Sequence, residues 1–324
     1  MKKILFLIFY IFSFISNLFA QKTQEFYDKA VIKDLQKPKD AFNFLVVGDW
    51  GRNGHYNQQQ VADRMDETAH HLGIEMVIST GDNFYSDGVM SIDDPQWRTS
   101  FENIYNGANL LVNWYPILGN HDYRGNPQAQ IDYSKKSRRW NMPSAYYSFE
   151  RTLDDDSGEK ILFVFMDTNP FERKYYKDET YMFTDVVKQD TVKQLKWLNQ
   201  TLAQSTAKWK IVIGHHPLYT TGKRIKETPY VRYSLESILE KYKVDVYFCG
   251  HEHDLQHQKR TDKFTNHFTS GAGSETRPVS DPQPYTKFAK AEHGFMAVSA
   301  TSKEMLVQVI NDKGEVIYKT VIGK

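Results

Sequence analysis

Five short polar clusters in this sequence each combine a glycine with side chains that bind metal ions or transfer protons. Each cluster directly follows a run of apolar residues that has the length of a β-strand. In α/β sheets the loops at the carboxyl ends of strands collect ligands, and a glycine before the first polar residue allows a sharp turn. The clusters are Gly48-Asp49-Trp50-Gly51, Gly81-Asp82-Asn83-Phe84-Tyr85, Gly119-Asn120-His121-Asp122, Gly214-His215-His216-Pro217 and Gly250-His251-Glu252-His253.

Taken singly, none of these clusters is diagnostic. A glycine followed by an aspartate is typical of a turn, and a lone histidine is more often packed or at the surface than bound to metal. The complete set is different, because two aspartates, an asparagine and three histidines follow successive strands of one chain. This order predicts a dinuclear metal site. Carboxylate, amide and imidazole donors suit iron, zinc and manganese, and one bridging carboxylate can hold two cations about 3.5–4 Å apart.

An alternation of apolar strands with amphipathic helices must position these clusters. The helices are predicted from apolar residues that recur every three or four positions, as in Val61, Met65, Ala69 and Leu72. We expect helices over 57–72, 191–202 and 231–242. We expect strands over 43–47, 75–80, 114–118, 160–167, 209–213 and 244–249.

The C-terminal part changes character, because its apolar runs follow one another without helices between them. The whole pattern predicts the α/β class, with two mixed sheets packed face to face and helices outside, a four-layer α/β/β/α sandwich. Residues 41–324 should form this single catalytic domain. The expected C-terminal strands are 267–271, 295–301, 305–310 and 316–321, with a hairpin turn at Asp312-Lys313-Gly314.

The first residues have the pattern of a secretory signal peptide. Lys2 and Lys3 precede an apolar run over 4–12, polar residues follow, and Ala20 is a small residue suited to cleavage. The run is too short to span a bilayer. We therefore expect cleavage of the signal peptide 1–20, a secreted or periplasmic protein, and no stable membrane anchor. Residues 21–40 are polar and should form a short N-terminal extension.

The charge balance gives no general electrostatic attraction to nucleic acid or to anionic lipid. The chain has 41 basic and 40 acidic residues, and loss of Lys2 and Lys3 leaves 39 basic residues and a net charge of −1. We therefore expect no nucleic-acid partner. The one cysteine, Cys249, allows no internal disulfide and should be an inert core thiol.

The five clusters resemble the motif blocks of the calcineurin-like metallophosphoesterases, and within that family those of the purple acid phosphatases. In the broader family the first block has a histidine where this chain has Gly51, and here Tyr85 follows Asp82 by three residues. This paired exchange marks the purple acid phosphatases. The resemblance to their small tartrate-resistant type covers nearly all of residues 42–322. Further matching segments are Arg139-Trp140-Asn141-Met142-Pro143, Met166-Asp167-Thr168, Ser270-Gly271-Ala272-Gly273 and Ser302-Lys303-Glu304-Met305.

The resemblance implies a role for each residue of the metal site. Asp82 would bridge the two ions, and Asn120 would contact both an ion and the substrate. His121 would lie beside the substrate as a hydrogen-bond donor and general acid. These three would be the catalytic residues. The implied ligands of ferric iron are Asp49, Asp82, Tyr85 (as a phenolate) and His253, and those of Fe2+, Zn2+ or Mn2+ are Asp82, Asn120, His215 and His251.

The chain departs from this family pattern at two points. In the small purple acid phosphatases a second substrate-contacting histidine lies nine positions after the histidine that matches His215. Here that position is Arg224, next to Lys223. We therefore regard Lys223 and Arg224 as candidate substrate-binding residues, with a solvent-exposed loop as the alternative. The mammalian members also have a disulfide that this chain cannot form.

The resemblance implies a metal-dependent acid phosphatase that hydrolyses phosphate monoesters, with a metal-bound hydroxide as the nucleophile. A phosphodiesterase or nucleotide pyrophosphatase on the same scaffold is the first alternative, and Gly51 and Tyr85 argue against it. A non-catalytic metal- or phosphate-binding protein is the second, and the presence of all seven ligand residues argues against it. We expect small phosphorylated substrates, with phosphoproteins as an open alternative, and a monomer.

Other histidines and basic residues are expected to have no role in the site. His216 should be structural, because it points the opposite way from its neighbour His215. The basic residues Lys135, Lys136, Arg138 and Arg139 should lie in a solvated loop. The remaining histidines are His55, His70, His71, His257, His267 and His293.

Overall fold

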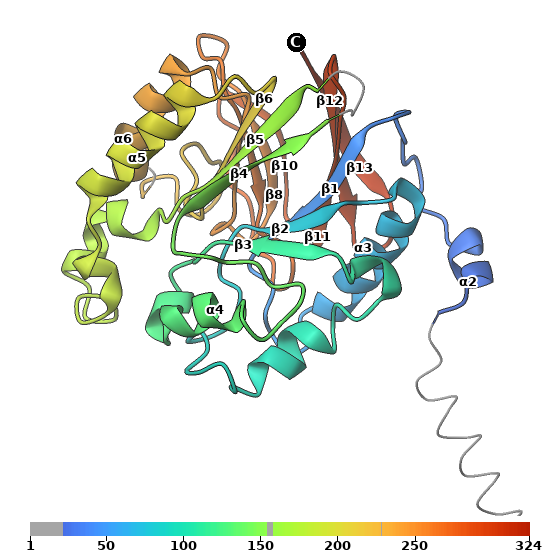
Figure 1. Ribbon diagram of the computed structural model, residues 1–324, viewed down its shortest axis with the longest axis horizontal. Helices are drawn as coiled ribbons and strands as arrows, with labels where there is room; N and C mark the ends of the chain where they lie inside the picture. The colour runs from blue at the N-terminus through green and yellow to red at the C-terminus, as the bar shows by residue number, and fades with distance from the viewer. Residues whose placement is uncertain (1–21, 154–157, 228) are drawn as a thin grey trace, which may run out of the picture.

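Two β-sheets pack face to face in the centre of the computed structural model, which describes residues 22–153, 158–227 and 229–324 (Figure 1). The expected signal peptide lies outside the described residues. The first sheet consists, in order, of β13 (Val316–Gly323), β12 (Glu304–Asn311), β11 (Gly294–Ala300), β1 (Phe42–Val47), β2 (Met76–Ser79) and β3 (Asn113–Pro116). The second consists of β10 (Thr286–Lys290), β8 (Leu255–Gln258), β9 (Asn266–Ser270), β7 (Val246–Cys249), β6 (Trp209–Ile213), β5 (Lys160–Phe165) and β4 (Tyr147–Thr152).

The central strands of both sheets are parallel and their residues are buried on both faces. β1 pairs in parallel with β2, and β2 with β3, while β5, β6, β7 and β9 form the parallel part of the second sheet. Continuous apolar strands are typical of such doubly covered sheets. Phe44 of β1 contacts Phe163 of β5 across the sandwich, with ring centroids 5.4 Å apart in an edge-to-face arrangement. Aromatic side chains of the two sheets therefore meet in the core, among aliphatic residues such as Ile161 and Ile211.

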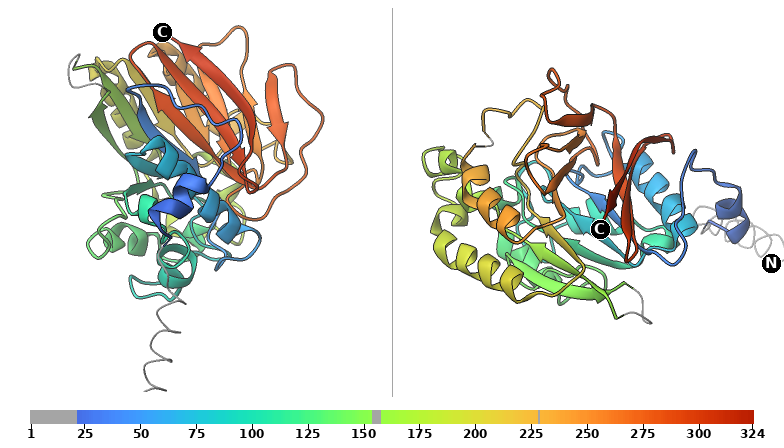
Figure 2. Two further views of the ribbon diagram at one scale, coloured as in Figure 1. Left: turned by 90° about the vertical axis from the view of Figure 1, so that its right-hand side faces the viewer. Right: turned by 90° about the horizontal axis from the view of Figure 1, so that it is seen from above.

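Helices cover the outer faces of the two sheets (Figures 1 and 2). Helix α3 (Gln58–Leu72) lies against β1 and β11 of the first sheet. Helices α5 (Thr191–Gln204) and α6 (Pro229–Lys241) pack apolar residues such as Leu198 and Leu235 on the outer face of β5, β6 and β7. The predicted α/β class and arrangement of two mixed sheets with helices outside are confirmed.

Three strands were not predicted, because their sequences lack a continuous apolar run. The strand β4 contains Glu150 and Arg151, β10 contains two lysines, and β8 has the polar sequence Leu-Gln-His-Gln although it is buried. Both β4 and β10 lie at edges of the second sheet. Charged residues are common in edge strands, where they oppose pairing with other chains. By contrast, the predicted turn before β13 is present, with Gly314 at a φ of +77°.

The N-terminal extension packs on the domain rather than leaving it. It contains the short helix α2 (Gln24–Lys29), whose Tyr27 is buried and donates a hydrogen bond to Asp66 of α3 at 2.7 Å. Gln36 exchanges two hydrogen bonds with Gln308 of β12. These contacts explain why a polar segment is ordered here.

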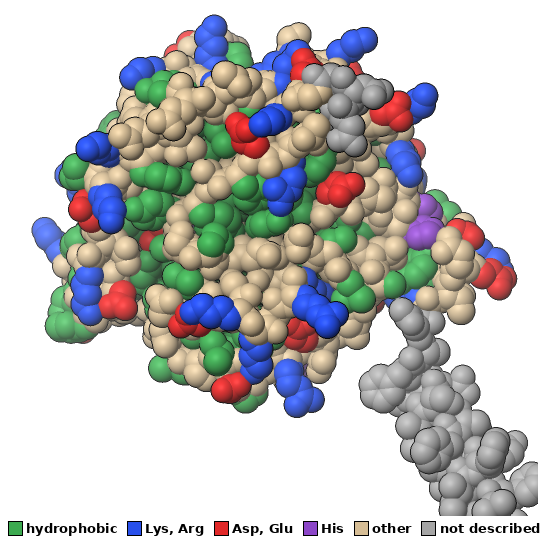
Figure 3. All heavy atoms as spheres, viewed as in Figure 1, with side chains coloured by type: hydrophobic (Ala, Val, Ile, Leu, Met, Phe, Trp, Pro, Cys, Tyr) green, Lys and Arg blue, Asp and Glu red, His purple; other side chains and the backbone are tan. Residues whose placement is uncertain are grey.

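Basic and acidic side chains are interspersed over the face of the molecule that Figure 3 shows. This agrees with the near balance of 41 basic and 40 acidic residues in the sequence. In the part of the chain that the structure describes, the helices are too short or too polar to traverse a lipid bilayer.

Candidate metal centre

The parallel strands of both sheets direct their carboxyl ends to the same edge of the sandwich. Asp49, Asp82 and Asn120 follow β1, β2 and β3 of the first sheet, and His215 and His251 follow β6 and β7 of the second. A hydrogen bond of 3.0 Å from the main-chain N–H of His251 to Asp49 Oδ2 joins the two sets. Sheet packing thus brings together Asp49 and His251, which are 202 positions apart in the sequence.

Three of the candidate ligands have a left-handed backbone conformation, which is strained for a residue that carries a Cβ atom. Their φ angles are +58° for Asp49, +49° for Asp82 and +69° for His251. Such strain costs about 1–3 kcal/mol per residue and concentrates at functional sites. Of the glycines before them, Gly81 also has a positive φ, of +93°, so it shares the sharp turn with Asp82 as expected. Gly250 is needed instead for close approach, because a Cβ there would lie 2.4 Å from Asp49 Oδ2.

The phenolic oxygen of Tyr85 lies at the centre of a first group of donor atoms. It is 2.9 Å from Asp49 Oδ1, 2.9 Å from Asp82 Oδ2 and 3.0 Å from His253 Nε2. All four side chains are buried. One phenolic proton cannot satisfy two carboxylates, so this group contains more acceptors than hydrogen-bond donors. A cation bound among these atoms would satisfy them.

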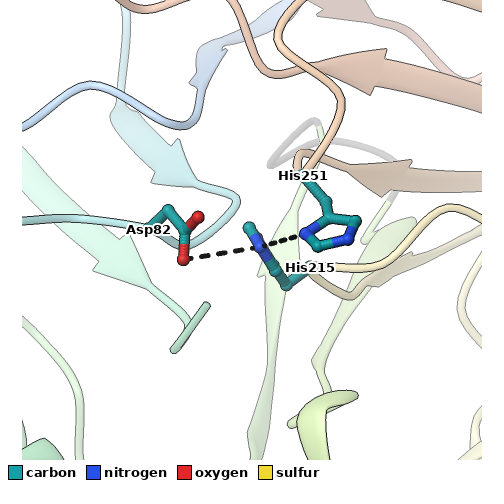
Figure 4. Close-up of side chains that lie close together, drawn as sticks. All are labelled: Asp82, His215 and His251. Carbon is teal, nitrogen blue, oxygen red and sulfur yellow. Dashed lines mark hydrogen bonds and ion pairs between the residues drawn. The ribbon is translucent and has the colours of Figure 1, made fainter. Parts of the chain in front are cut away.

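The second group of donor atoms surrounds His215 Nε2 (Figure 4). This nitrogen lies 3.3 Å from Asn120 Oδ1, 3.2 Å from His251 Nδ1 and 3.5 Å from Asp82 Oδ1. The ligand atoms of Asp82, His215 and His251 all lie within 4.8 Å of one another. Asp82 therefore contributes one carboxylate oxygen to each group and lies between them. The structure brings together all seven residues that the sequence predicted as ligands.

The charge of the site also fits bound cations. Burial raises the pKa of Asp49 to about 7, against the opposing attraction of His215. Burial alone would lower the pKa of His215, but the charge and hydrogen bond of Asp82, the charge of Asp49 and the Thr80 carbonyl together raise that pKa to about 9. The carboxylates thus attract positive charge strongly enough to protonate a buried imidazole. Metal ions would supply that charge and leave His215 neutral, as a ligand must be.

Two glutamates face the outer ring nitrogens of the histidines, and sequence reasoning missed both. His251 Nε2 lies 3.9 Å from Glu227 Oε2, and His253 Nδ1 lies 3.8 Å from Glu275 Oε2. Among the described residues neither buried nitrogen has a hydrogen-bond partner. Metal-binding histidines ordinarily donate their second N–H to a carboxylate, which orients the ring. Arg52 in turn holds Glu275 at 2.7 Å and lies 3.8 Å from the ring centroid of Tyr85.

His121 lies next to Asp82, which both donor groups share, and its place beside the substrate stays a prediction. Its main-chain N–H donates to Asp82 Oδ1 at 2.8 Å, and its Nδ1 is 2.5 Å from the Ser86 carbonyl oxygen. Because a carbonyl can only accept, Nδ1 carries a proton. The other nitrogen, Nε2, is directed toward the site and lies 3.9 Å from Asp82 Oδ2. Burial lowers the pKa of the His121 imidazole.

The structure places Arg224 behind His251, while the side chain of Lys223 is exposed. Arg224 Nη1 donates a hydrogen bond to the main-chain carbonyl of His251. Its guanidinium also lies 3.8 Å from Glu252 Oε2 and 3.7 Å from Glu227 Oε2. Substrate binding by Lys223 and Arg224 stays a prediction, and these contacts favour a role for Arg224 in holding His251.

The prediction that the basic residues of 135–139 lie in a solvated loop is wrong for Arg139. Lys135 and Lys136 are exposed, but the Arg139 residue is only 6 % exposed. Its guanidinium pairs with Glu102 at 2.9 Å and lies 4.3 Å from the ring centroid of Phe101. A guanidinium can be buried at such a site because its planar face stacks while its edge donates hydrogen bonds.

Two other polar residues of the clusters support the site from behind. His216 is buried, with Nδ1 2.9 Å from Thr168 Oγ1 and Nε2 2.8 Å from the Tyr175 hydroxyl, which agrees with the expected structural role. Asp122 accepts hydrogen bonds from the main-chain N–H groups of Asn83 and Gly119. It ties the loops after β2 and β3 together. Its position inside a predicted cluster was the signal that could have identified it.

Comparison with known proteins agrees with this arrangement of strands and donor atoms. The family of calcineurin-like phosphoesterases matches residues 42–255. Purple acid phosphatase 4 of Arabidopsis thaliana is 37 % identical over 299 residues, which cover 90 % of this chain and 86 % of the relative. Human tartrate-resistant acid phosphatase type 5 is 32 % identical over 298 residues, which cover 86 % of this chain and 90 % of the relative.

Among solved structures, GAP50, the anchor in the inner membrane complex of Plasmodium, has the same fold. Its TM-score is 0.76 at 24 % sequence identity, with 87 % of this chain and 89 % of GAP50 covered. The family match spans all five strands that precede the donor clusters, β1, β2, β3, β6 and β7, and includes every donor cluster. The chain therefore belongs to the calcineurin-like phosphoesterases and, within that family, to the purple acid phosphatases.

Proposed function

We propose that this protein hydrolyses phosphate monoesters at a centre of two metal ions. The observation that carries the proposal is the position of Asp82. Its Oδ2 lies 2.9 Å from the Tyr85 hydroxyl in one donor group, and its Oδ1 lies 3.5 Å from His215 Nε2 in the other. A carboxylate shared in this way suits two cations that act on one phosphoryl group. Small phosphorylated molecules are the substrates that such a centre accepts.

The two donor groups differ in their chemistry, and this difference suggests different ions. The group with a phenol and two carboxylates suits a hard ion such as Fe3+, and the group with two imidazoles suits Fe2+, Zn2+ or Mn2+. When bound, the cations neutralise charge on the phosphoryl oxygens and lower the pKa of water. The first ion would be held by Asp49, Asp82, Tyr85 and His253, and the second by Asp82, Asn120, His215 and His251.

The side chains next to the donor groups would bind and orient the substrate. Asp82 holds the main chain of His121, and the Ser86 carbonyl holds its Nδ1. The ring is thereby fixed with Nε2 toward the site. In its protonated form Nε2 can donate to a phosphoryl oxygen and then transfer its proton to the leaving oxygen.

Hydrolysis of p-nitrophenyl phosphate compared with its bis ester tests this proposal. The metal-loaded protein should release p-nitrophenol faster from the monoester, and removal of both metals with a chelator should abolish the release. Readdition of metal should restore it. Faster release from the bis ester would favour a phosphodiesterase instead.

A non-catalytic role is the second candidate, because GAP50 is described as an anchor and shares the fold. The retention of all seven donor residues and of His121 in this chain argues against that role. A protein that bound two metal ions but hydrolysed neither ester would support it.

The iron-loaded protein should be pink to purple, because a Tyr85 phenolate bound to ferric iron produces a charge-transfer band. Tyr85→Phe should bleach the colour while the protein stays folded, since the ring is kept. The visible spectrum and the iron content of both proteins check this. An unchanged spectrum in the variant would remove Tyr85 from the ligands. A colourless protein with two zinc or manganese ions would contradict the assignment of iron alone.

We also propose that the mature protein begins at or near Gln21 and lies outside the cytoplasm. The motivation is the pattern of Lys2 and Lys3 followed by a short apolar run. Intact-mass measurement of protein from its native host should give a chain that lacks residues 1–20. Recovery of the full chain from the membrane fraction would contradict the proposal.

A further inference from the structure

Tyr181 reaches the candidate metal centre from a segment that has no predicted cluster. It lies between β5 and α5, in a stretch of short turns, and is only 4 % exposed. Asn120 Nδ2 donates a hydrogen bond of 2.6 Å to the Tyr181 hydroxyl, while Asn120 Oδ1 faces His215. The same amide therefore connects Tyr181 to the second donor group.

Arg124 occupies the remaining acceptor capacity of that hydroxyl. Its Nε lies 3.1 Å and its Nη2 lies 2.7 Å from the Tyr181 oxygen. Three N–H groups from two side chains thus converge on one oxygen that has two lone pairs. The hydroxyl proton must then point away from Asn120 and Arg124. Within the described part of the chain, no group accepts a hydrogen bond from the Tyr181 hydroxyl.

Tyr181 and Arg124 belong to the same wall of the site as His121. Arg124 Nη1 lies 3.5 Å from the Ser86 carbonyl oxygen, which also receives His121 Nδ1. A buried hydroxyl that lacks an acceptor for its proton is costly, and an anionic oxygen would satisfy it. The positive charge of Arg124, which the oxygen of Tyr181 faces, makes the hydroxyl a stronger donor.

From this geometry we propose that Tyr181 contacts the substrate, with its hydroxyl donating a hydrogen bond to a nonbridging oxygen of the phosphate group. Arg124 acts through Tyr181 by occupying its oxygen and polarising its O–H bond. The inference rests on the proposed function. It adds a phosphate contact from a segment without a predicted cluster, in a chain that has Arg224 where the small purple acid phosphatases have a second substrate-contacting histidine.

Binding of inorganic phosphate to the metal-loaded protein, measured by calorimetry, tests the proposal. Tyr181→Phe keeps the ring and its packing on Tyr175, whose centroid is 4.3 Å away, and removes only the hydroxyl. Phosphate should bind about 10- to 100-fold more weakly, the usual loss for a hydrogen bond to a charged group. KM for p-nitrophenyl phosphate should rise by a similar factor.

Tyr175→Phe is the matched control. It removes a hydroxyl from an equally buried tyrosine of the same segment, but this hydroxyl contacts His216 rather than the site. Phosphate affinity and KM should stay within about twofold of the original protein. An equal loss in both variants would overturn the proposal, because it would show a general effect on the segment.

Metal content separates substrate contact from positioning of Asn120. Tyr181→Phe should still bind two metal ions per chain, and loss of one ion would overturn the proposal. Arg124→Met should also weaken phosphate binding, and adding it to Tyr181→Phe should cause little further loss because both act through one hydroxyl. If Tyr181→Phe does not fold, Arg124→Met with unchanged phosphate affinity would overturn the proposal by itself.

An error in the inference about Tyr181 can be distinguished from an error in the proposed function. If that function is wrong, the unaltered metal-loaded protein will not hydrolyse p-nitrophenyl phosphate. If the inference about Tyr181 alone is wrong, the unaltered protein will be active and Tyr181→Phe will match it in phosphate affinity and KM.

Discussion

Asp82→Asn should remove both metal ions from the protein and nearly all of its activity. The two carboxylate oxygens serve different donor groups, with Oδ2 2.9 Å from the Tyr85 hydroxyl and Oδ1 3.5 Å from His215 Nε2. The substitution keeps the shape of the side chain but removes its charge and turns one oxygen into an N–H donor. Bound metals contribute several kcal/mol to transition-state stabilisation, so the rate should fall on the order of 10³-fold or more.

Elemental analysis of the purified variant, together with p-nitrophenyl phosphate hydrolysis, checks this result. Asp167→Asn is a suitable control, because Asp167 is a buried carboxylate at the end of β5 that accepts hydrogen bonds from Tyr123 and Asn169. Asp167 is not among the seven candidate ligands, so this substitution changes a buried carboxylate near the site without removing a donor atom. The control should retain two ions per chain. If Asp82→Asn also retained two ions, its bridging role would be refuted.

His121→Ala should reduce turnover by about 10²- to 10⁴-fold, the usual contribution of a positioned general acid. The ring is held by Ser86 and Asp82 with Nε2 toward the site. Arg224, at the position of the family's second histidine, cannot replace it as an acid because a guanidinium stays protonated at any working pH. The loss should be larger for an alkyl phosphate than for p-nitrophenyl phosphate, because an alkoxide leaving group needs the proton more.

The two substrates must be compared at saturation, so that kcat is measured separately from KM. His70→Ala, at a surface histidine that pairs with Asp28, provides the control and should leave kcat unchanged for both substrates. An equal loss on both substrates in His121→Ala would show that His121 binds the phosphate without protonating the leaving group. Wild-type kcat on both would remove it from the mechanism.

The polar clusters that contain the candidate donors could be identified from the sequence because each cluster is local, whereas the role of each ligand came from the family resemblance. Asp49, Asp82 and Asn120 each follow an apolar run within a few residues, and parallel strands that share a sheet must end at one edge. The α/β class and the helices followed from periodicity in the same way. Local pattern predicted which residues follow these strands, although the strands that precede the donor clusters are spread along much of the sequence.

The contacts that support the donors were decided by the tertiary structure alone. Glu227, Glu275 and Tyr181 reach the site from loops without a motif, and nothing in their local sequence separates them from other surface residues. The strand β8 was missed because its polar side chains are buried by partners elsewhere in the chain.

Arg139 and Arg224 show the same limit for charged residues. Both occur next to other basic residues, a local pattern that is typical of a solvated loop. Arg139 is buried against Glu102 and Phe101. Arg224 lies close to Glu252 and Glu227 and donates a hydrogen bond to the carbonyl of His251. The sequence by itself determined the fold class and which polar clusters follow the strands, because period and motif are properties of short segments. The environment of each charge depends on partners far away in the chain, so only the folded structure could decide it.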